Sequence, residues 1–465
     1  MSSPTSAAPV SGARTARRFS SPGTPGLAAV STLGCKINSF ESAAMAQDLA
    51  KDQWKLVGPA EYADLYVINS CTVTAEADRQ TRQAVRRALR QNPLAQVVVT
   101  GCYAQNEAEE CAAIPGVSLV LGNDQKRAVA KFARTLKRPD EPGRVPVHID
   151  RLTSLPAALL NGFDSRSRAF LQVQQGCDQS CTFCVIHRAR GPSRSFAEAH
   201  VLRQIQAFVD SGYREVVICG VDLGSYTTGE VSDEVDLPLT SLLRKIADLP
   251  GSFRVRLSSI DPVHLTDDLL DLLSDGSRFC PYLHVSMQSG STLILKRMKR
   301  RYGRESLIDR LSAARQRIGG LVLGADVMTG FPTESDRDFT DSLEVIKSAQ
   351  IIYPHVFCFS GRPGTPAARI PRQIERVERR RRASILRDAG QTLRCEALNR
   401  MVGQHGSLIM ERPDAAEKPG AYHGRLANYM PVRLEDPENA CLTEICVQIQ
   451  GVDSDVLVAR VSPSE

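Results

Sequence analysis

Three cysteines lie close together in the stretch CDQSCTFC, residues 177–184. Cys177, Cys181 and Cys184 are spaced C-x3-C-x2-C, with Phe183 directly before the last thiol. Three thiolates held this tightly on one loop cannot complete the tetrahedral site of a structural zinc ion. They can bind three irons of a 4Fe-4S cubane and leave the fourth iron open, which is what a bidentate small molecule needs.

This spacing resembles the signature of the radical S-adenosylmethionine (SAM) superfamily. The resemblance implies that the open iron binds the amino and carboxylate groups of SAM, and that an electron from the cluster breaks the C–S bond of SAM. The alternative is three metal-free cysteines that fall together by chance. The apolar residues Phe170, Leu171 and Val173 before the loop and IHRARGPSRS after it favour the cluster.

The composition is that of a soluble globular protein of two to four domains. The chain has 465 residues, of which 42% are hydrophobic and 24% are charged, and a formal net charge of +6. No apolar run approaches the roughly 20 residues that cross a bilayer, so we expect a cytoplasmic protein without membrane contact. Thirteen cysteines in a chain of this length indicate intracellular metal binding. The charge is mild, so binding of nucleic acid has to depend on local patches.

Composition and periodicity divide the chain into five predicted ranges. These are a disordered extension over 1–27, an α/β domain over 28–137, a linker over 138–160, a (β/α) barrel over 161–395 and a small β-barrel over 399–462. The extension is rich in Ser, Pro, Ala and Gly and has no acidic residue, so it cannot bury a core. A transit peptide and a bacterial N-terminal extension both fit this composition, and we favour the second.

Strands alternate with helices in the first domain, which predicts a doubly wound parallel sheet covered by helices. Ser39 is the expected N-cap of the first helix. Three predicted strands end in a cysteine, namely Cys35 after TLG, Cys71 after INS and Cys102 after VTG. Because ligands gather outside the carboxyl ends of parallel strands, we expect these thiols to meet in a second three-thiolate cluster site. The alternative is three ordinary half-buried cysteines.

The second domain alternates strands and helices again and predicts a (β/α) barrel, with about six units by analogy with radical SAM enzymes. Reactions in such barrels take place at the carboxyl ends of the strands. Gly220, Asp222, Ser259 and Gln288 stand at those ends. The resemblance implies that they line the SAM pocket, and ordinary turn chemistry is the alternative for each of them.

Four motifs together resemble the methylthiotransferase family of radical SAM enzymes. TLGCKINSFES, INSCTVTAEADRQTRQ and VVTGCYAQ are similar to its three cysteine motifs, and VQQGCDQSCTFCVIHRARGPSRS is similar to its radical SAM motif. The cysteine motifs most resemble the subgroup that acts on N6-threonylcarbamoyladenosine at position 37 of tRNA. One departure is His187, where many relatives have proline.

Short alternating strands with glycine-containing turns over 399–462 predict a small closed β-barrel. Its HGRLANYMPV stretch resembles the RNA-binding TRAM module, which makes Tyr422, Arg425 and Tyr429 candidate RNA contacts. The alternative is a lid that only stabilises. The basic stretch KRMKRR, residues 296–301, is a further candidate for RNA phosphates, whereas Arg379–Arg382 are equally explained by intrahelical ion pairs.

The resemblance implies an enzyme with two 4Fe-4S clusters and SAM. Cys177, Cys181 and Cys184 would hold the SAM-cleaving cluster, and the other triad an auxiliary cluster that carries the sulfur. One SAM would methylate that sulfur, and another would give a 5′-deoxyadenosyl radical that removes hydrogen from C2 of the adenine. No side chain deprotonates an aromatic C–H at neutral pH, so the reaction requires cofactor radical chemistry. The implied partners are the tRNA anticodon loop and an external electron donor, and we expect a monomer.

Two alternatives to this function stay open. The first is the same chemistry on isopentenyladenosine in tRNA or on an aspartate of a ribosomal protein, against which the first cysteine motif argues by resemblance. The second is a non-catalytic iron–sulfur protein that binds RNA. A triad with an open iron inside a SAM-type barrel argues against the second.

The two triads predict the metal content. Protein reconstituted without oxygen should carry about eight irons, four in each cubane. Changing Cys177, Cys181 and Cys184 together to Ala should leave half of that iron, measured by colorimetric iron analysis. A full iron load in this triple variant would show that these three cysteines bind no cluster.

Overall fold

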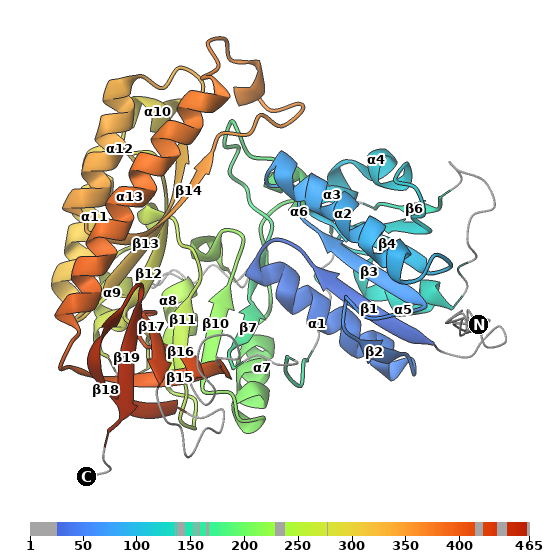
Figure 1. Cartoon of the computed structure of the whole chain (residues 1–465), viewed down its shortest axis with the longest axis horizontal. Helices are drawn as coiled ribbons and strands as arrows, with labels where there is room; N and C mark the ends of the chain where they lie inside the picture. The colour runs from blue at the N-terminus through green and yellow to red at the C-terminus, as the bar shows by residue number, and fades with distance from the viewer. Residues whose placement is uncertain are drawn as a thin grey trace, which may run out of the picture.

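The computed structural model describes residues 26–134, 136, 145–150, 152–153, 155, 159–163, 167–227, 238–276, 278–413, 422–434 and 444–462. Three parts follow one another along the chain: an α/β layer, a half-barrel of parallel strands and a small β-barrel (Figure 1). The predicted extension over 1–27 falls almost entirely outside the described residues, and so does part of the predicted linker over 138–160.

Six parallel strands form the first sheet, in the order β2-β1-β3-β4-β5-β6. Their bounds are β1 (Leu27–Thr32), β2 (Lys55–Val57), β3 (Leu65–Ser70), β4 (Gln96–Gly101), β5 (Leu119–Leu121) and β6 (Val147–His148). The central strands β3 and β4 are buried along their whole length, as expected for a parallel sheet covered on both faces. The edge strand β6 lies within the range predicted as a linker.

Helices cover both faces of this sheet, which confirms the predicted doubly wound layer. They are α1 (Lys36–Lys51), α2 (Ala75–Gln91), α3 (Cys102–Asn106), α4 (Ala108–Ala112) and α5 (Val129–Ala133). Met45 and Leu49 of α1 pack on one face together with Val129 of α5. Val85 of α2 and Cys111 of α4 pack on the other face.

The half-barrel has six parallel strands, which confirms the expected parallel radical SAM architecture. They are β7 (Ala169–Gln172), β10 (Glu215–Cys219), β11 (Arg254–Leu257), β12 (Tyr282–Gln288), β13 (Val322–Thr329) and β14 (Ile351–Cys358). Isolated bridges Val255–Phe279 and Ile260–Val285 join the sheet β11-β10-β7 to the sheet β12-β13-β14. Helix α1 of the first layer packs against the edge strand β7, so the open side of the half-barrel faces that layer (Figure 1).

Helices follow the strands of the half-barrel and cover its outer face (Figure 1). Their bounds are α7 (Glu198–Asp210), α8 (Pro238–Ala247), α9 (Asp267–Ser274), α10 (Thr292–Arg297), α11 (Arg304–Arg317), α12 (Asp336–Ser348) and α13 (Arg376–Arg400). The long helix α13 packs along β14 and leads into the C-terminal part.

The C-terminal part is a closed barrel with the strand order β15-β16-β17-β19-β18, as the sequence predicts. The strands are β15 (His405–Pro413), β16 (Tyr422–Leu426), β17 (Pro431–Leu434), β18 (Glu444–Asp453) and β19 (Val456–Val461). Closure leaves none of these short strands with an unpaired edge, which allows so small a sheet to persist.

A buried carboxylate, Glu215, holds the amino ends of the half-barrel strands and the C-terminal barrel together. It is fully buried and accepts hydrogen bonds from Arg254 Nε and Arg256 Nε, each at 2.7 Å. Arg254 also donates to the carbonyl oxygens of Ser407 and Arg425 in the C-terminal barrel, each at 3.1 Å. The seam between the two barrels is therefore a charged network.

Tyr429 and Arg425 of the TRAM-like stretch face this seam. The Tyr429 ring lies 4.7 Å from the Tyr282 ring, and the Arg425 guanidinium stands 4.2 Å from the Tyr429 ring centroid. Arg256 lies over the same ring at 5.0 Å. The Tyr429 ring, one of the three candidate RNA contacts, is therefore engaged with the half-barrel, and Arg425 packs on that ring from within the C-terminal barrel.

Glu215→Gln tests the seam. Burial by itself would raise the pKa of Glu215, yet Arg256 and Arg254 lower it to about 2. Because the pKa of Glu215 is lower in the folded state than the value near 4.3 of an unfolded chain, its charge stabilises the fold at pH values above about 4.3. This stabilisation is lost as the pH falls toward 2. We expect the variant to lose about 3–5 kcal/mol at pH 7, because two buried guanidinium groups lose their anion.

Thermal melts from pH 7 to pH 3 measure the effect. The difference between the wild type and Glu215→Gln should narrow as the pH falls. The control is Glu198→Gln, whose ion pair with Lys245 at 2.8 Å is largely solvated and should contribute little. A difference independent of pH would contradict the role of the Glu215 charge.

Candidate functional site

The loop with Cys177, Cys181 and Cys184 opens onto a cavity at the carboxyl ends of the half-barrel strands. It follows the short strand β8 (Gln174–Gln175) and precedes α6 (Ile186–Arg190), and β8 pairs with β9 (Arg194–Ser195). All three cysteines line this cavity of about 150 Å³. The strand-end positions of the barrel therefore meet the cysteine loop, as barrel chemistry requires.

Three of the four residues predicted to bind SAM line the same cavity, namely Asp222, Ser259 and Gln288. An Asp222 carboxylate oxygen lies 3.9 Å from Cys177 Sγ, and Gln288 has a left-handed backbone with a φ of 59°. Gly220, the fourth predicted residue, does not line this cavity. A Cβ there would lie 2.8 Å from the Cα of Leu223, so the turn itself requires glycine. Binding of SAM by these residues stays a prediction.

Two charged residues of this cavity were not predicted from the sequence. Arg300 donates from Nη1 to Cys181 Sγ at 3.5 Å and forms an ion pair with Asp261 at 2.6 Å. Arg300 belongs to KRMKRR, so one arginine of that stretch faces the cysteine loop. Asp261 follows Ser259 at the end of β11, and this strand-end position was the signal that could have found it.

The thiols of the loop are close enough to affect one another. Burial, together with the neighbouring thiol of Cys181, raises the pKa of Cys177 to about 12 and that of Cys184 to about 11. Neighbouring thiolates repel one another in a poorly solvated pocket, and bound iron would reverse this effect. The residues therefore fit the cationic cluster that the sequence predicts.

The second triad, Cys35, Cys71 and Cys102, lies at the carboxyl ends of the strands of the first sheet. Cys71 and Cys102 come directly after β3 and β4, and Cys35 lies three residues after the end of β1. These three strands are neighbours in the sheet. Burial, together with the neighbouring thiols of Cys102 and Cys35, raises the pKa of Cys71 to about 12. A Cβ on Gly34 would lie 2.7 Å from Cys71 Cβ, so this glycine permits the close approach.

The start of α1 differs from the prediction. The helix begins at Lys36 with Cys35 as its N-cap, so the prediction of Ser39 as N-cap is wrong. The Cys35 thiol gives α1 no side-chain cap, and Ser, Thr, Asp and Asn are the usual caps. Burial raises the pKa of Cys35 despite this position at a helix N-terminus, and the Arg190 guanidinium opposes the shift.

Arg190 of α6 connects the two triads. Its guanidinium is almost fully buried and donates to Cys102 Sγ at 3.2 Å and to the two carboxylate oxygens of Glu41 at 2.5 and 3.1 Å. Lys126 forms a second ion pair with Glu41 at 2.7 Å. Burial alone would raise the pKa of Glu41, but Arg190 and Lys126 lower it to about 2.

The part of the chain that the structure describes contains no group of three or more His, Cys, Asp or Glu side chains arranged around a single metal ion. A cubane needs a different arrangement, because each of its three thiolates binds a different iron. Both triads fit this arrangement. The thiols of Cys177, Cys181 and Cys184 come from one loop, and those of Cys35, Cys71 and Cys102 come from the carboxyl ends of neighbouring strands.

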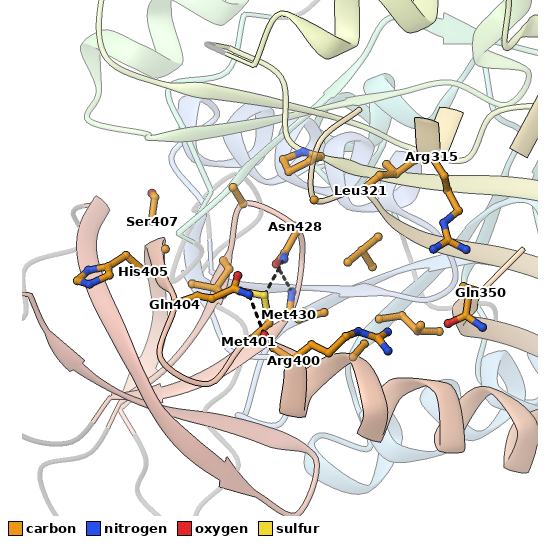
Figure 2. Close-up of a pocket in the computed structure, with 18 residues that line it drawn as sticks. Arg315, Leu321, Gln350, Arg400, Met401, Gln404, His405, Ser407, Asn428 and Met430 are labelled. Carbon is orange, nitrogen blue, oxygen red and sulfur yellow. Dashed lines mark hydrogen bonds between the residues drawn. The ribbon is translucent and has the colours of Figure 1, made fainter. Parts of the chain in front are cut away.

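A larger cavity of about 450 Å³ lies at the opposite end of the half-barrel, where α13 meets the C-terminal barrel (Figure 2). Arg315, Gln350 and Arg400 line one side of it, and Gln404 and Asn428 line the other. None of the six predicted cluster ligands lines it. This cavity is therefore part of the seam between the two barrels.

The sequence matches two families. Residues 28–122 match "Uncharacterized protein family UPF0004", and residues 171–346 match the "Radical SAM superfamily". The first match covers the sheet with Cys35, Cys71 and Cys102, and the second covers the cysteine loop and most of the half-barrel. No helix in the described ranges has the length and apolar character to span a bilayer.

Curated relatives align with most of the chain. "Threonylcarbamoyladenosine tRNA methylthiotransferase MtaB" of Bacillus subtilis is 35% identical over 410 residues, which are 88% of this chain and 90% of the relative. The protein of the same name from Rickettsia prowazekii is 36% identical over 87% of this chain and 90% of its own length. A "tRNA-2-methylthio-N(6)-dimethylallyladenosine synthase" of Corynebacterium urealyticum is 30% identical over 90% of this chain and 79% of its own length.

Among solved structures, the radical S-adenosylmethionine methyltransferase TsrM of Kitasatospora setae with cobalamin and a 4Fe-4S cluster bound has a similar fold. It superposes with a TM-score of 0.54 at 14% identity, over 74% of this chain and 76% of TsrM. At this identity the likeness concerns the fold alone.

Arg190→Met tests the link between the triads. Loss of this guanidinium leaves the buried Glu41 with Lys126 as its remaining cation, which we expect to cost about 3–5 kcal/mol. The thermal unfolding midpoint of the metal-free protein measures this cost. Arg188→Met on the same helix is the control, because Arg188 is exposed and bonds only to the Pro363 carbonyl oxygen at 2.9 Å among the described residues. Equal losses in both variants would contradict a special role of Arg190.

Proposed function

Because the chain belongs to the family of radical SAM methylthiotransferases, we propose that it adds a methylthio group to C2 of N6-threonylcarbamoyladenosine at position 37 of tRNA. The observation that carries this proposal is the pair of cysteine triads on two facing parallel sheets, joined by the buried Arg190. The identity to relatives named for threonylcarbamoyladenosine supports the choice of substrate.

As a radical SAM enzyme, the protein uses a 4Fe-4S cluster and SAM, which supply a radical that can remove hydrogen from an aromatic carbon. Cys177, Cys181 and Cys184 would hold this cluster. Asp222, Ser259 and Gln288 would orient SAM by hydrogen bonds, and Gln288 Oε1 is buried without a partner among the described residues. The ion pair of Arg300 and Asp261 fixes the Arg300 guanidinium beside Cys181.

Cys35, Cys71 and Cys102 would hold a second 4Fe-4S cluster, whose open iron would carry the sulfur to be transferred. Arg190 places a fixed positive charge 3.2 Å from Cys102 Sγ. This charge would stabilise the anionic thiolate ligand and hold the sheet edge against the cysteine loop. Helix α1 closes the open side of the half-barrel next to Cys35 and limits the entry of water that would compete for the radical.

The substrate is tRNA, and the base has to leave the stack of the anticodon loop to reach the site. Lys296 and Lys299 of KRMKRR are exposed and remain candidates for contact with RNA phosphates. Tyr422 and the rest of the C-terminal barrel would add contacts, as the TRAM resemblance implies. The external electron donor and a monomeric state stay predictions.

The sister reaction on N6-dimethylallyladenosine is the second candidate. It is favoured by the 30% identity to a synthase of that name over 90% of this chain. The two candidates differ in the N6 group of the adenine, which is an anionic amino acid derivative in one and a hydrocarbon in the other. Assay of both tRNAs with the same enzyme separates them.

An anaerobic assay tests the proposed function. Reconstituted protein with SAM, reductant and sulfide should convert tRNA that carries N6-threonylcarbamoyladenosine into its 2-methylthio form, measured by mass spectrometry of nucleosides. Changing Cys35, Cys71 and Cys102 together to Ala should abolish this product while cleavage of SAM to 5′-deoxyadenosine survives.

Two results would contradict the proposal. Turnover only of dimethylallyl-containing tRNA would assign the other substrate. Loss of SAM cleavage in a folded triple variant that keeps the loop cluster would contradict the separate roles of the two triads. A matched control is Cys111→Ala, since Cys111 is buried in the core of the first layer away from the sheet edge.

A further inference from the structure

A cavity of about 320 Å³ lies inside the half-barrel, between the seam residues Arg256 and Tyr429 and the start of α1. Lys36, the residue after Cys35, lines it, and so do His284 and His355. Both histidines contact the Asp326 carboxylate, at 3.3 and 2.8 Å. Asp326 also accepts a hydrogen bond from Ser259 of the predicted SAM pocket at 3.3 Å. One layer of side chains therefore separates this cavity from the pocket with Cys177, Cys181 and Cys184.

Two residues that line the cavity carry buried hydrogen-bond donors without an acceptor among the described residues. Arg256 is almost fully buried, and its Nη1 has no partner even though its Nε and Nη2 bind Glu215. The Tyr353 hydroxyl is also buried without a partner. Lys36 differs from these two, because it is exposed, and it forms no ion pair within the described part of the chain. Unpaired buried donors are costly, so a site that keeps them is suited to an acceptor that arrives with a ligand.

Three guanidinium groups lie over the ring of Tyr429, which lines the cavity: Arg425 at 4.2 Å, Arg256 at 5.0 Å and Arg168 at 5.6 Å from the ring centroid. Burial alone would raise the pKa of Tyr429, which lines the cavity, yet Arg425, Arg168 and Lys36 lower it below its usual value. Glu215 of β10 and Glu411 of the C-terminal barrel both contact Arg168, and Asp326 is engaged with His284 and His355, so the anions near the cavity already have cationic partners. An anionic group is therefore the favoured occupant.

We propose that this cavity binds the carboxylate of the N6-threonylcarbamoyl group, through Lys36, Arg256 and Tyr353, and so selects the substrate base. The inference rests on the proposed function and specifies which residues recognise its substrate. A dimethylallyl group has no acceptor for these three donors and would leave them unpaired, which is the kind of loss that gives strong discrimination. An RNA phosphate would offer the same anionic chemistry, and the experiment below separates the two sources.

The test measures equilibrium binding of three anticodon stem-loop RNAs to the anaerobically reconstituted protein without SAM. The RNAs are identical except for adenosine 37, which is unmodified, N6-dimethylallylated or N6-threonylcarbamoylated. The wild type should bind the threonylcarbamoylated RNA about tenfold more tightly than the other two, since a hydrogen bond to a charged group has about that effect.

Tyr353→Phe and Lys36→Met should each remove most of this preference while binding of the unmodified RNA stays the same. Lys36→Arg keeps the cation and should retain the preference. The matched controls are Tyr62→Phe and Lys55→Met, both exposed residues of the first layer outside the cavity, which should bind all three RNAs like the wild type. These variants spare the buried pair of Arg256 and Glu215, so folding is not at risk from its loss.

Three outcomes would overturn the inference. The first is a full preference in both variants. The second is an equal loss of affinity for all three RNAs, which would assign the donors to an RNA phosphate. The third is a wild type that shows no preference at all. The proposed function is tested separately, because methylthiolation of the threonylcarbamoylated tRNA with any of these binding results would leave the reaction established and only its recognition residues in doubt.

Discussion

The buried guanidinium of Arg190 fixes the two halves of the candidate site relative to each other. It extends from α6, directly after the cysteine loop, to Glu41 and Asn38 on α1 and to Cys102 at the start of α3. Both facing surfaces are the carboxyl edges of parallel sheets, where loops carry polar groups, so an apolar interface is not available there. A planar group with five donors can satisfy several acceptors at once, which makes arginine suited to such a contact.

A second charged network has the same function at the other end of the half-barrel. Glu215 binds Arg254 and Arg256, and Arg254 continues to carbonyl oxygens of the C-terminal barrel. Buried ion pairs add little net stability, but loss of one partner leaves an uncompensated charge. They therefore specify the relative position of two domains more strongly than they stabilise either domain.

One short segment has several roles because of where α1 begins. Cys35 is the N-cap of α1, Lys36 is its first residue, and Asn38 and Glu41 on the same helix bind Arg190. Two turns of one helix thus supply three features of the site. These are a predicted cluster ligand, a cation that lines the inner cavity and the residues that bind Arg190. Small shifts of α1 against β7 would affect all three, which is why charged contacts that hold this helix matter for the site.

The sequence by itself determined the strand and helix alternation, the closed C-terminal barrel and the positions of Cys35, Cys71 and Cys102 at strand ends. These features depend on short-range periodicity and on spacing within one loop, which are visible without tertiary contacts. The tertiary structure alone decided the direction of long polar side chains. Arg190 and Glu41 are 149 residues apart in the sequence, Arg300 turns from a basic stretch toward Cys181, and Tyr429 turns from a candidate RNA surface into the seam. Their partners come from other domains, and local sequence carries no information on which distant group will share a buried pocket.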